Sequence, residues 1–219
     1  DFDIRELSYT IANFHNLSYR FFQFEQALAA AAPERRKKAK EAIQQALMNR
    51  DIVNDYEDIV AYSTLPLRVM HHDTKINNIL FDHAHKGICV IDLDTVMPGY
   101  FISDIGDMMR TYLSPCNEEE EDLDKISIRE DFFAAIAEGY FLEMGSILTG
   151  NEKRLFYYAG KFMMYMQAIR FLTDYLNNDV YYQARHPDHN LNRANNQFTL
   201  LELYKDAEIR FQSIIAQMR

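Results

Sequence analysis

The segment HHDTKINN, residues 71–78, lies between two short apolar runs, and IDLD, residues 91–94, follows at the end of a third. Asp73 and Asn78 are five positions apart, and Asp92 follows Asp73 by 19 positions. A loop between two short strands can aim Asp73 and Asn78 at one point, and a hairpin then returns Asp92 to the same place. The segment therefore predicts a strand, a polar loop and a β-hairpin that gather two carboxylates and one amide.

These residue types at this spacing indicate phosphoryl transfer. D-x-x-x-x-N is the spacing of a kinase catalytic loop, in which the Asp receives the proton of the acceptor hydroxyl. Asn78 and Asp92 offer the oxygen ligands that Mg²⁺ prefers, and Lys75 can place an ammonium group beside the transferred phosphoryl group. Asp and Asn are also common in ordinary turns. Their combination with His71, Asp73 and a hairpin is far less expected by chance, so we favour the catalytic interpretation.

The rest of the chain predicts helices. Apolar residues recur at three- and four-residue spacing, Pro33 suits the first turn of a helix, and Ser127 with Glu130 has the spacing of a capping box. The one predicted β unit is a hairpin formed by apolar runs around the polar turn 82–87. We predict a mainly α fold with a small β-hairpin, whose helices cover residues 4–14, 19–31, 35–49, 52–62, 127–148, 152–177 and 195–218.

The composition and charge of the chain predict its cellular compartment and exclude some classes of partner. The 219 residues carry a net charge of −10, which argues against binding of nucleic acid or of an anionic membrane surface. The two cysteines cannot build a disulfide framework, and the sequence has neither a secretory signal nor an apolar run long enough to span a membrane. We therefore expect a cytoplasmic protein with no nucleic-acid partner and no membrane partner.

The motifs resemble those of the aminoglycoside phosphotransferase and choline kinase superfamily, whose catalytic loop has the pattern H-G-D-x-x-x-x-N and whose metal strand ends in I-D. His72 stands where that superfamily usually has Gly, and Lys75 stands where many members have His. A wider set of segments resembles the N-acetylhexosamine 1-kinase branch: NFHN (13–16), DTKINN (73–78), IDLDTVMPG (91–99), RFLTDYL (170–176) and HPDHNL (186–191).

The resemblance implies a fold and a set of roles. The fold is the C-terminal helical lobe of a protein-kinase-like, aminoglycoside phosphotransferase-like enzyme, with ATP and Mg²⁺ as cofactors. Asp73 is the catalytic base and contacts the acceptor, while Asn78 and Asp92 bind Mg²⁺ and, through it, the nucleotide. Arg170 and Tyr181 line the sugar pocket. The implied reaction transfers the γ-phosphoryl group of ATP to the anomeric hydroxyl of an N-acetylhexosamine.

Supporting roles follow from the same resemblance. Asp104 braces the catalytic loop by hydrogen bonds, Asp107 shares that task, and His71 acts as a strut of the loop. Arg110 contacts the sugar or the phosphate, or else forms a surface salt bridge. The acidic run 118–122 is interpreted as a solvated loop.

The sequence contains no glycine-rich phosphate loop, and no β-rich segment precedes the helices. We therefore expect residues 1–219 to form the C-terminal catalytic and substrate lobe, which needs the N-terminal nucleotide-binding lobe of the same polypeptide as its partner. Without half of the nucleotide cleft, this lobe alone is expected to be nearly inactive.

Three alternatives remain open. The acceptor can be another small hydroxylated molecule, such as choline, homoserine or an aminoglycoside. A kinase-like domain can instead bind a sugar or a protein without catalysis. Histidine pairs suggest zinc, but none has the spacing of a zinc-binding helix, and Pro187 is expected to prevent a helical arrangement of the last pair. The pairs are His71–His72, His83–His85 and His186–His189.

Overall fold

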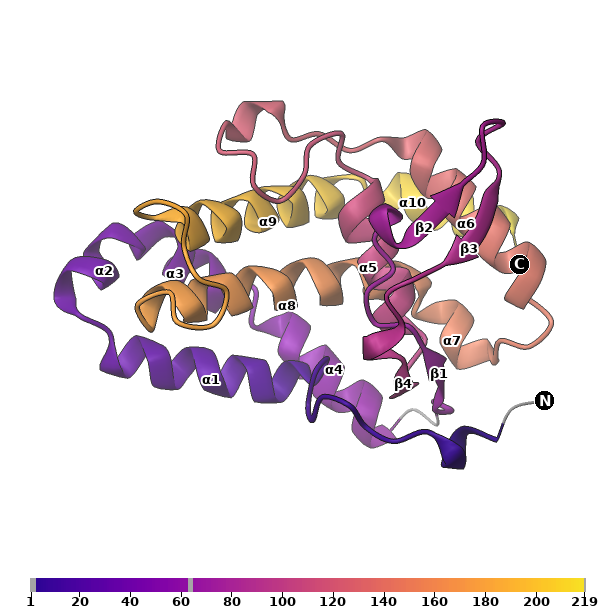
Figure 1. Cartoon of the computed structure of the whole chain (residues 1–219), viewed down its shortest axis with the longest axis horizontal. Coiled ribbons are helices and arrows are strands. Elements are labelled where there is room, and N and C mark those ends of the chain that lie inside the picture. Colours follow the sequence, from indigo (N-terminus) through magenta and orange to yellow (C-terminus); the bar gives the residue numbers. More distant parts are fainter. Residues whose placement is uncertain (1–2, 63–64, 219) are drawn as a thin grey trace.

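A 21-residue helix, α8 (Phe156–Leu176), forms the centre of the fold (Figure 1). It is apolar around most of its circumference, and nearly all of its residues are buried. Three helices pack along it, namely α1 (Leu17–Ala30), α5 (Ile102–Tyr112) and α9 (His189–Asp206). The central position predicted for this apolar stretch is confirmed.

The computed structural model describes residues 3–62 and 65–218; residues 1, 2, 63, 64 and 219 lie outside that description. The mainly α fold with a small hairpin is confirmed. None of the described helices combines the length and apolarity needed to cross a bilayer. The remaining helices are α2 (Pro33–Lys38), α3 (Lys40–Met48), α4 (Asp51–Tyr62), α6 (Glu130–Met144), α7 (Gly150–Arg154) and α10 (Glu208–Gln217).

Two antiparallel strand pairs lie beside α5 (Figure 1). The predicted hairpin is formed by β2 (Ile79–Phe81) and β3 (Gly87–Val90), with Ile79 opposite Val90. The second pair, β1 (Arg68–Met70) with β4 (Met97–Gly99), has a strand that the sequence did not predict. Pro98 lies in β4 and cannot donate a ladder hydrogen bond, so this strand lacks the usual sequence pattern and forms only a short two-stranded pair.

The helix predicted over residues 4–14 is wrong. Only a single 3₁₀ turn, Ile4–Glu6, forms there, and Asn13 has a left-handed backbone with φ of 54°. The first α-helix instead begins at Leu17, where the Asn16 side chain caps it by accepting a hydrogen bond from the Tyr19 backbone N–H at 3.0 Å. Three-residue apolar spacing cannot distinguish an extended segment that packs on the core from a helix.

Other predicted helices have different ends. The helix over 35–49 breaks at Ala39, the helix over 152–177 breaks at Leu155, and the last helix begins at His189 and breaks at Ala207. Ser127 does not cap α6. Arg129 occupies the cap position and makes no side-chain capping bond, and its backbone N–H donates to the Leu113 carbonyl at 2.9 Å. Tertiary anchoring therefore sets this helix start.

The capping box of the described chain lies at α7 instead. The Thr149 hydroxyl accepts from the Glu152 backbone N–H, and the Glu152 carboxylate accepts from the Thr149 backbone N–H at 2.7 Å. Glu152 is fully buried and also binds Arg68 of β1 at 2.6 Å. One side chain thus fixes the start of α7 to the strand that leads into the 71–78 segment.

Gly106 lets α5 approach α8 closely. A Cβ atom at this position would lie 2.3 Å from the Ala159 carbonyl oxygen and 2.8 Å from the Met163 Cβ atom. Gly139, in the middle of α6, has no heavy atom within 4 Å of such a Cβ. The two glycines therefore differ in what they allow, although both lie inside helices.

Substituting each with alanine should change stability in opposite directions. Gly106→Ala forces α5 away from the α8 backbone and should lower the free energy of unfolding by about 1–3 kcal/mol. Gly139→Ala should raise it by roughly 0.5–1 kcal/mol, because alanine favours the helix. Urea unfolding followed by circular dichroism measures both. Equal effects of the two substitutions would contradict the close packing of α5 on α8.

Candidate active site

The 71–78 loop connects β1 to β2 and is held by the first turn of α5. The two carboxylate oxygens of Asp104 accept the backbone N–H groups of His71 at 2.9 Å and His72 at 2.8 Å. The Thr74 hydroxyl adds a bond to the Asp104 carbonyl at 2.9 Å. Burial raises the pKa of Asp104 to about 6, although the two backbone hydrogen bonds favour its charged form.

His71 joins this loop to the end of the hairpin. Its Nδ1 atom accepts the Asp73 backbone N–H at 3.3 Å, so Nε2 carries the proton and donates to the Ile91 carbonyl at 3.0 Å. The Thr95 hydroxyl also donates to the His71 carbonyl at 2.6 Å. His71 therefore lies between Asp73 and the residue that precedes Asp92.

Asp73, Lys75 and Asn78 form one cluster. The Asp73 Oδ2 atom accepts from Lys75 Nζ at 2.7 Å and from Asn78 Nδ2 at 2.9 Å. Asn78 also donates to the Asp73 carbonyl at 2.8 Å, which turns its amide nitrogen toward the loop. Both donors contact one carboxylate oxygen, so Oδ1 is the Asp73 atom that can accept a proton from a ligand in the adjoining cavity.

Asp92 lies at the same end of the hairpin but does not line that cavity. It follows β3 with a left-handed backbone, φ of 61°, and its side chain is exposed. The Ile91 N–H donates to the Asn78 carbonyl at 2.9 Å, which brings the Asp92 backbone next to Asn78. The structure thus places Asp73 on the cavity side of the loop and Asp92 at its exposed edge.

The donor set at this edge fits a hard cation. Within residues 3–62 and 65–218, no three His, Cys, Asp or Glu side chains come together as a metal site. A cation here would rest on the Asp92 carboxylate and the Asn78 amide oxygen, and would need phosphate oxygens and water to complete its coordination. That requirement matches Mg²⁺, which usually keeps several waters and binds substrate phosphates.

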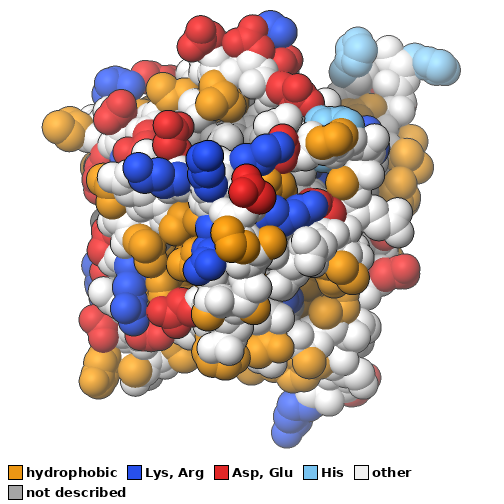
Figure 2. Space-filling model, turned by 90° about the vertical axis from the view of Figure 1, so that its left-hand side faces the viewer, with side chains coloured by type: hydrophobic (Ala, Val, Ile, Leu, Met, Phe, Trp, Pro, Cys, Tyr) orange, Lys and Arg blue, Asp and Glu red, His pale blue; other side chains and the backbone are white. Residues whose placement is uncertain are grey.

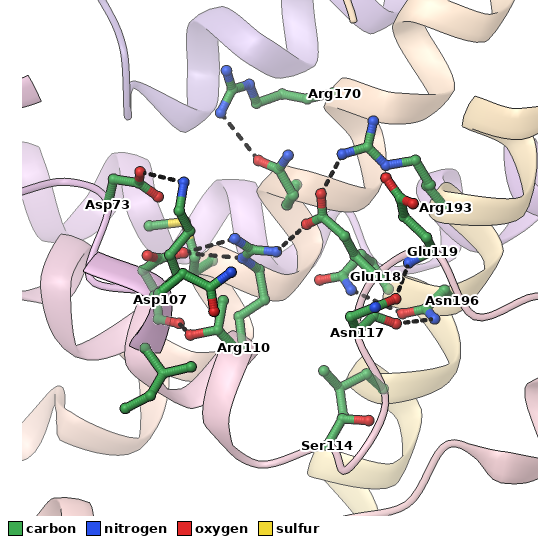
Figure 3. A pocket seen from close by; sticks show the side chains of 18 of the residues that line it. Asp73, Asp107, Arg110, Ser114, Asn117, Glu118, Glu119, Arg170, Arg193 and Asn196 are labelled. Atoms are coloured by element: carbon green, nitrogen blue, oxygen red, sulfur yellow. Dashed lines mark hydrogen bonds and ion pairs between the residues drawn. The ribbon is translucent and has the colours of Figure 1, made fainter. Parts of the chain in front are cut away.

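A large cavity, which we call the main cavity, opens beside Asp73 (Figure 3). Its volume is about 950 Å³, and its walls come from the 71–78 loop, α5, the segment 114–119, α8, the segment 181–185 and α9. Arg170 and Tyr181 both line it, as do Asp73 and Lys75. The sequence-predicted acceptor residues therefore share one cavity with the predicted base.

A chain of largely buried ion pairs lies in the wall of this cavity (Figure 3). Asp107 accepts from Arg110 at 2.9 Å, Arg110 donates to Glu118 at 2.6 Å, and Glu118 also pairs with Arg193 of α9. Burial disfavours the Arg110 cation, yet the two flanking carboxylates raise its pKa above the usual value. Burial opposes the charged form of Glu118 as well, but Arg110 and Arg193 lower its pKa.

Two sequence interpretations need correction here. Arg110 is not part of a surface salt bridge, because its side chain is only 9% exposed and lies between two carboxylates. Glu118 does not belong to a solvated loop, since both of its oxygens are held inside the cavity wall. Glu119, Glu121 and Asp122, in contrast, are exposed.

A cluster of two histidines and a serine closes another part of the wall. His72 Nδ1 lies 2.7 Å from the Ser103 hydroxyl and 3.2 Å from His15 Nδ1, and His15 also contacts that hydroxyl. Burial lowers the pKa of His72 to about 4 and lowers the pKa of His15 well below its usual value. Both imidazoles are therefore neutral at pH 7.

His72 occupies its position through backbone strain and a glycine neighbour. Its φ of 65° is left-handed, the conformation that glycine adopts most readily. A Cβ at Gly99 would lie 2.4 Å from the His72 ring, so the ring fits only because position 99 has no side chain.

Sequence analysis missed several of these wall residues. Glu118 lies in the acidic run that predicted a solvated loop, Arg193 belongs to none of the quoted motifs, and their pairing joins positions 75 residues apart. His15 belongs to the NFHN segment, which carried the family resemblance but no assigned role. Its position directly before the first buried helix was the available signal.

The histidine pairs considered for zinc are placed differently from one another. His83 and His85 are exposed in the hairpin turn. His189 opens α9 and His186 precedes that helix, so the predicted absence of a helical arrangement is confirmed, although the two rings lie 4.7 Å apart. His186 contacts Glu121 at 3.1 Å.

The sequence model of the phosphotransferase enzyme family (APH) matches residues 4–141. The matched part contains the 71–78 loop, the hairpin, Asp92 and α5, and it ends inside α6.

The lowered pKa of His72 predicts acid sensitivity. The unfolded chain takes up a proton near pH 6.5 while folded His72 does not, so stability falls as pH falls from 6.5 toward 4. Between pH 7 and pH 5, this group should contribute a loss of about 2 kcal/mol. His72→Asn, which tolerates the left-handed backbone, should reduce the loss measured by urea unfolding, whereas His83→Asn should not. Asp104, whose pKa is raised, contributes the opposite pH dependence, but it does so equally in the wild type and in His72→Asn and therefore does not affect the difference between them. If His72→Asn loses as much stability between pH 7 and pH 5 as the wild type, His72 is not the source of the acid sensitivity.

Removing the shared carboxylate of the ion-pair chain should be strongly destabilising. Glu118→Gln leaves Arg193 without its carboxylate and Arg110 with Asp107 alone, and the free energy of unfolding should drop by about 1–3 kcal/mol. Glu119→Gln, whose partner Arg185 is exposed, should change it by less than about 0.5 kcal/mol. Denaturant titrations of both variants give the comparison, and similar values for the two would contradict a buried role for Glu118.

Proposed function

Because the chain belongs to the phosphotransferase enzyme family, we propose that it transfers the γ-phosphoryl group of ATP to a sugar hydroxyl, with the anomeric hydroxyl of an N-acetylhexosamine as the leading candidate. The observation that carries this proposal is the Asp73 carboxylate, which faces the main cavity with one oxygen held by Lys75 and Asn78. A carboxylate fixed in this way is suited to orient a hydroxyl bound in that cavity.

In the proposed reaction, the acceptor hydroxyl donates a hydrogen bond to Asp73 Oδ1 and its oxygen attacks the γ-phosphorus. The new oxygen–phosphorus bond forms as the bond to the β–γ bridging oxygen breaks, ADP leaves, and the hydroxyl proton ends on Asp73. Lys75 places positive charge 2.7 Å from Asp73 and beside the transferred group. Asn78 and Asp92 would hold a Mg²⁺ ion, which would neutralise charge on the phosphates.

Polar groups without partners support a hydroxylated acceptor. Among the described residues, four buried side-chain atoms have no hydrogen-bond partner, and all four belong to residues that line the main cavity. Buried polar atoms normally find a partner, so Arg129, Arg193 and Gln197 are suited to a ligand rich in donors and acceptors, whereas the His72 ring faces Gly99. The four atoms are His72 Nε2, Arg129 Nε, Arg193 Nε and Gln197 Oε1.

The charge of the cavity argues against a cationic acceptor. Its described lining contains more Lys and Arg side chains than carboxylates, although the whole chain has a net charge of −10. An aminoglycoside or choline would meet repulsion there, whereas a neutral sugar would not. The cations are Lys75, Arg110, Arg129, Arg170, Arg185 and Arg193, and the carboxylates are Asp73, Asp107, Glu118 and Glu119.

The hairpin supports the proposal of a partner lobe. Leu80 and Phe81 of β2 are 45% and 46% exposed, and Ile88 and Val90 of β3 are 62% and 53% exposed. A solvated hairpin usually exposes polar side chains on at least one face, so this apolar surface suits coverage by another part of the protein. We propose that an N-terminal nucleotide-binding lobe covers it and that residues 1–219 alone have little activity.

Asp73→Asn tests the catalytic assignment. In a polypeptide that includes the nucleotide-binding lobe, kcat should fall by roughly 10²–10⁴-fold because the base is lost, while the dissociation constant of the sugar changes little. An ADP-release assay over N-acetylhexosamines, hexoses, choline, homoserine and an aminoglycoside also identifies the acceptor. Asp94→Asn, an exposed carboxylate two positions after Asp92, serves as the control. Turnover of Asp73→Asn within threefold of the wild type would exclude Asp73 as the base.

A further inference from the structure

A smaller cavity adjoins the main cavity between α1 and α8, and we call it the side cavity. Its volume is about 160 Å³, and Arg170, Tyr181 and Tyr182 line both cavities, so these side chains form the wall between them. Arg20 and Gln23 of α1 line the opposite wall of the side cavity. Liquid water occupies about 30 Å³ per molecule, so this space is sufficient for a carboxylate or phosphate group.

Arg170 has most of its donors unused. Its Nη1 atom donates to the Gln167 amide oxygen at 3.0 Å (Figure 3), and no carboxylate of the described residues lies within ion-pair distance. The guanidinium group stands 5.1 Å from the Phe14 ring centroid and 5.6 Å from that of Tyr182. A guanidinium carries five N–H donors, so several remain directed at the two cavities.

Arg20 also lacks an ion pair within the described chain, although three of its five N–H donors are used. It donates to the Phe14 carbonyl at 3.2 and 3.1 Å and to the Gln23 amide oxygen at 2.8 Å, and it too has no carboxylate partner among the described residues. Burial and the nearby charge of Arg170 lower the pKa of Arg20, which shows that the two cations repel each other. Each arginine is thus paired with a neutral glutamine where a carboxylate would be expected.

The acidic residue at this site does not neutralise them. Asp174 lines the side cavity and lies one helical turn after Arg170, but its oxygens accept the backbone N–H groups of Tyr181 at 2.7 Å and Tyr182 at 2.9 Å. Asn190 donates to it as well, at 3.1 Å. The Asp174 carboxylate therefore holds the 181–182 segment in place and forms no ion pair with either arginine.

Most other half-buried arginines of the described chain pair with carboxylates, although Arg129 donates instead to the backbone carbonyls of Tyr112 and Ser114. Arg35 pairs with Asp179, and Arg68 pairs with Glu152. Two adjacent guanidinium groups without such partners are therefore unusual in a chain of net charge −10. Figure 2 shows, in space-filling form, the side of the molecule that lies at the left in Figure 1. Lys and Arg side chains gather on this surface, with carboxylates between them.

We propose that the side cavity is an anion-binding subsite, in which Arg20 and Arg170 bind one carboxylate or phosphate group. Arginine binds such groups through paired N–H donors, and two guanidinium groups around one small cavity can supply them from opposite walls. The anion is either a substituent of an acceptor that extends past Arg170 or an independent small anion. The subsite itself does not depend on the proposed function; only its use by an acceptor does.

Isothermal titration with inorganic phosphate at low ionic strength tests the subsite without nucleotide or turnover. Phosphate should bind the wild type at least tenfold more tightly than Arg20→Gln or Gln23→Glu. Gln23→Glu keeps the side-chain shape and places a carboxylate on Arg20, so it tests the charge without removing the arginine. Arg36→Gln, an exposed residue of α2 outside both cavities, makes the same charge change as Arg20→Gln and should bind like the wild type.

A second titration identifies the source of the anion. A hexosamine phosphate that binds at least tenfold more tightly than the neutral hexosamine, with the gain lost in Gln23→Glu, assigns the anion to the acceptor. Phosphate binding without such a gain assigns an independent anion. Equal phosphate affinity in the wild type, Arg20→Gln and Gln23→Glu, with no gain for the charged sugar, overturns the subsite. Loss of turnover in an otherwise intact Asp73→Asn enzyme bears on the proposed function alone.

Discussion

One carboxylate couples the candidate active site to the helical core. Asp104 stands in the first turn of α5, which packs on α8, and it accepts the N–H groups of two successive loop residues. The strands that flank the loop are only three residues long and cannot fix its position by themselves. The precision of the Asp73 cluster therefore derives from α5, and the close approach at Gly106 fixes α5 against the centre of the fold.

Local patterns predicted the parts of this arrangement that depend on neighbouring residues. The hairpin follows from two apolar runs around a polar turn, and the contact between Asp73 and Asn78 follows from their five-residue spacing. The central position of α8 follows from its apolar circumference. Each of these features is encoded within about 25 consecutive residues, where periodicity and turn chemistry act directly.

Features that depend on distant contacts were missed. Glu118 looks like its acidic neighbours in sequence, and only the approach of Arg110 and Arg193 separates it from them. The strand β4 contains a proline and pairs with a segment 29 residues earlier, so no local pattern identifies it. The segment before α1 has helical spacing but ends in a left-handed Asn13, because its side chains pack on β4 and α5 instead of on one another.

The His72 ring packs against Gly99, so the residue two positions after β1 constrains the last residue of β4. Glycine at position 72 would remove this clash and leave the Met70 side chain as the neighbour that a residue at 99 must displace, whereas an imidazole at 72 requires glycine at 99. The two sites should therefore change together during divergence of the family. A homologue that carries a bulky residue at both would have to move the loop away from α5, and with it the orientation of Asp73.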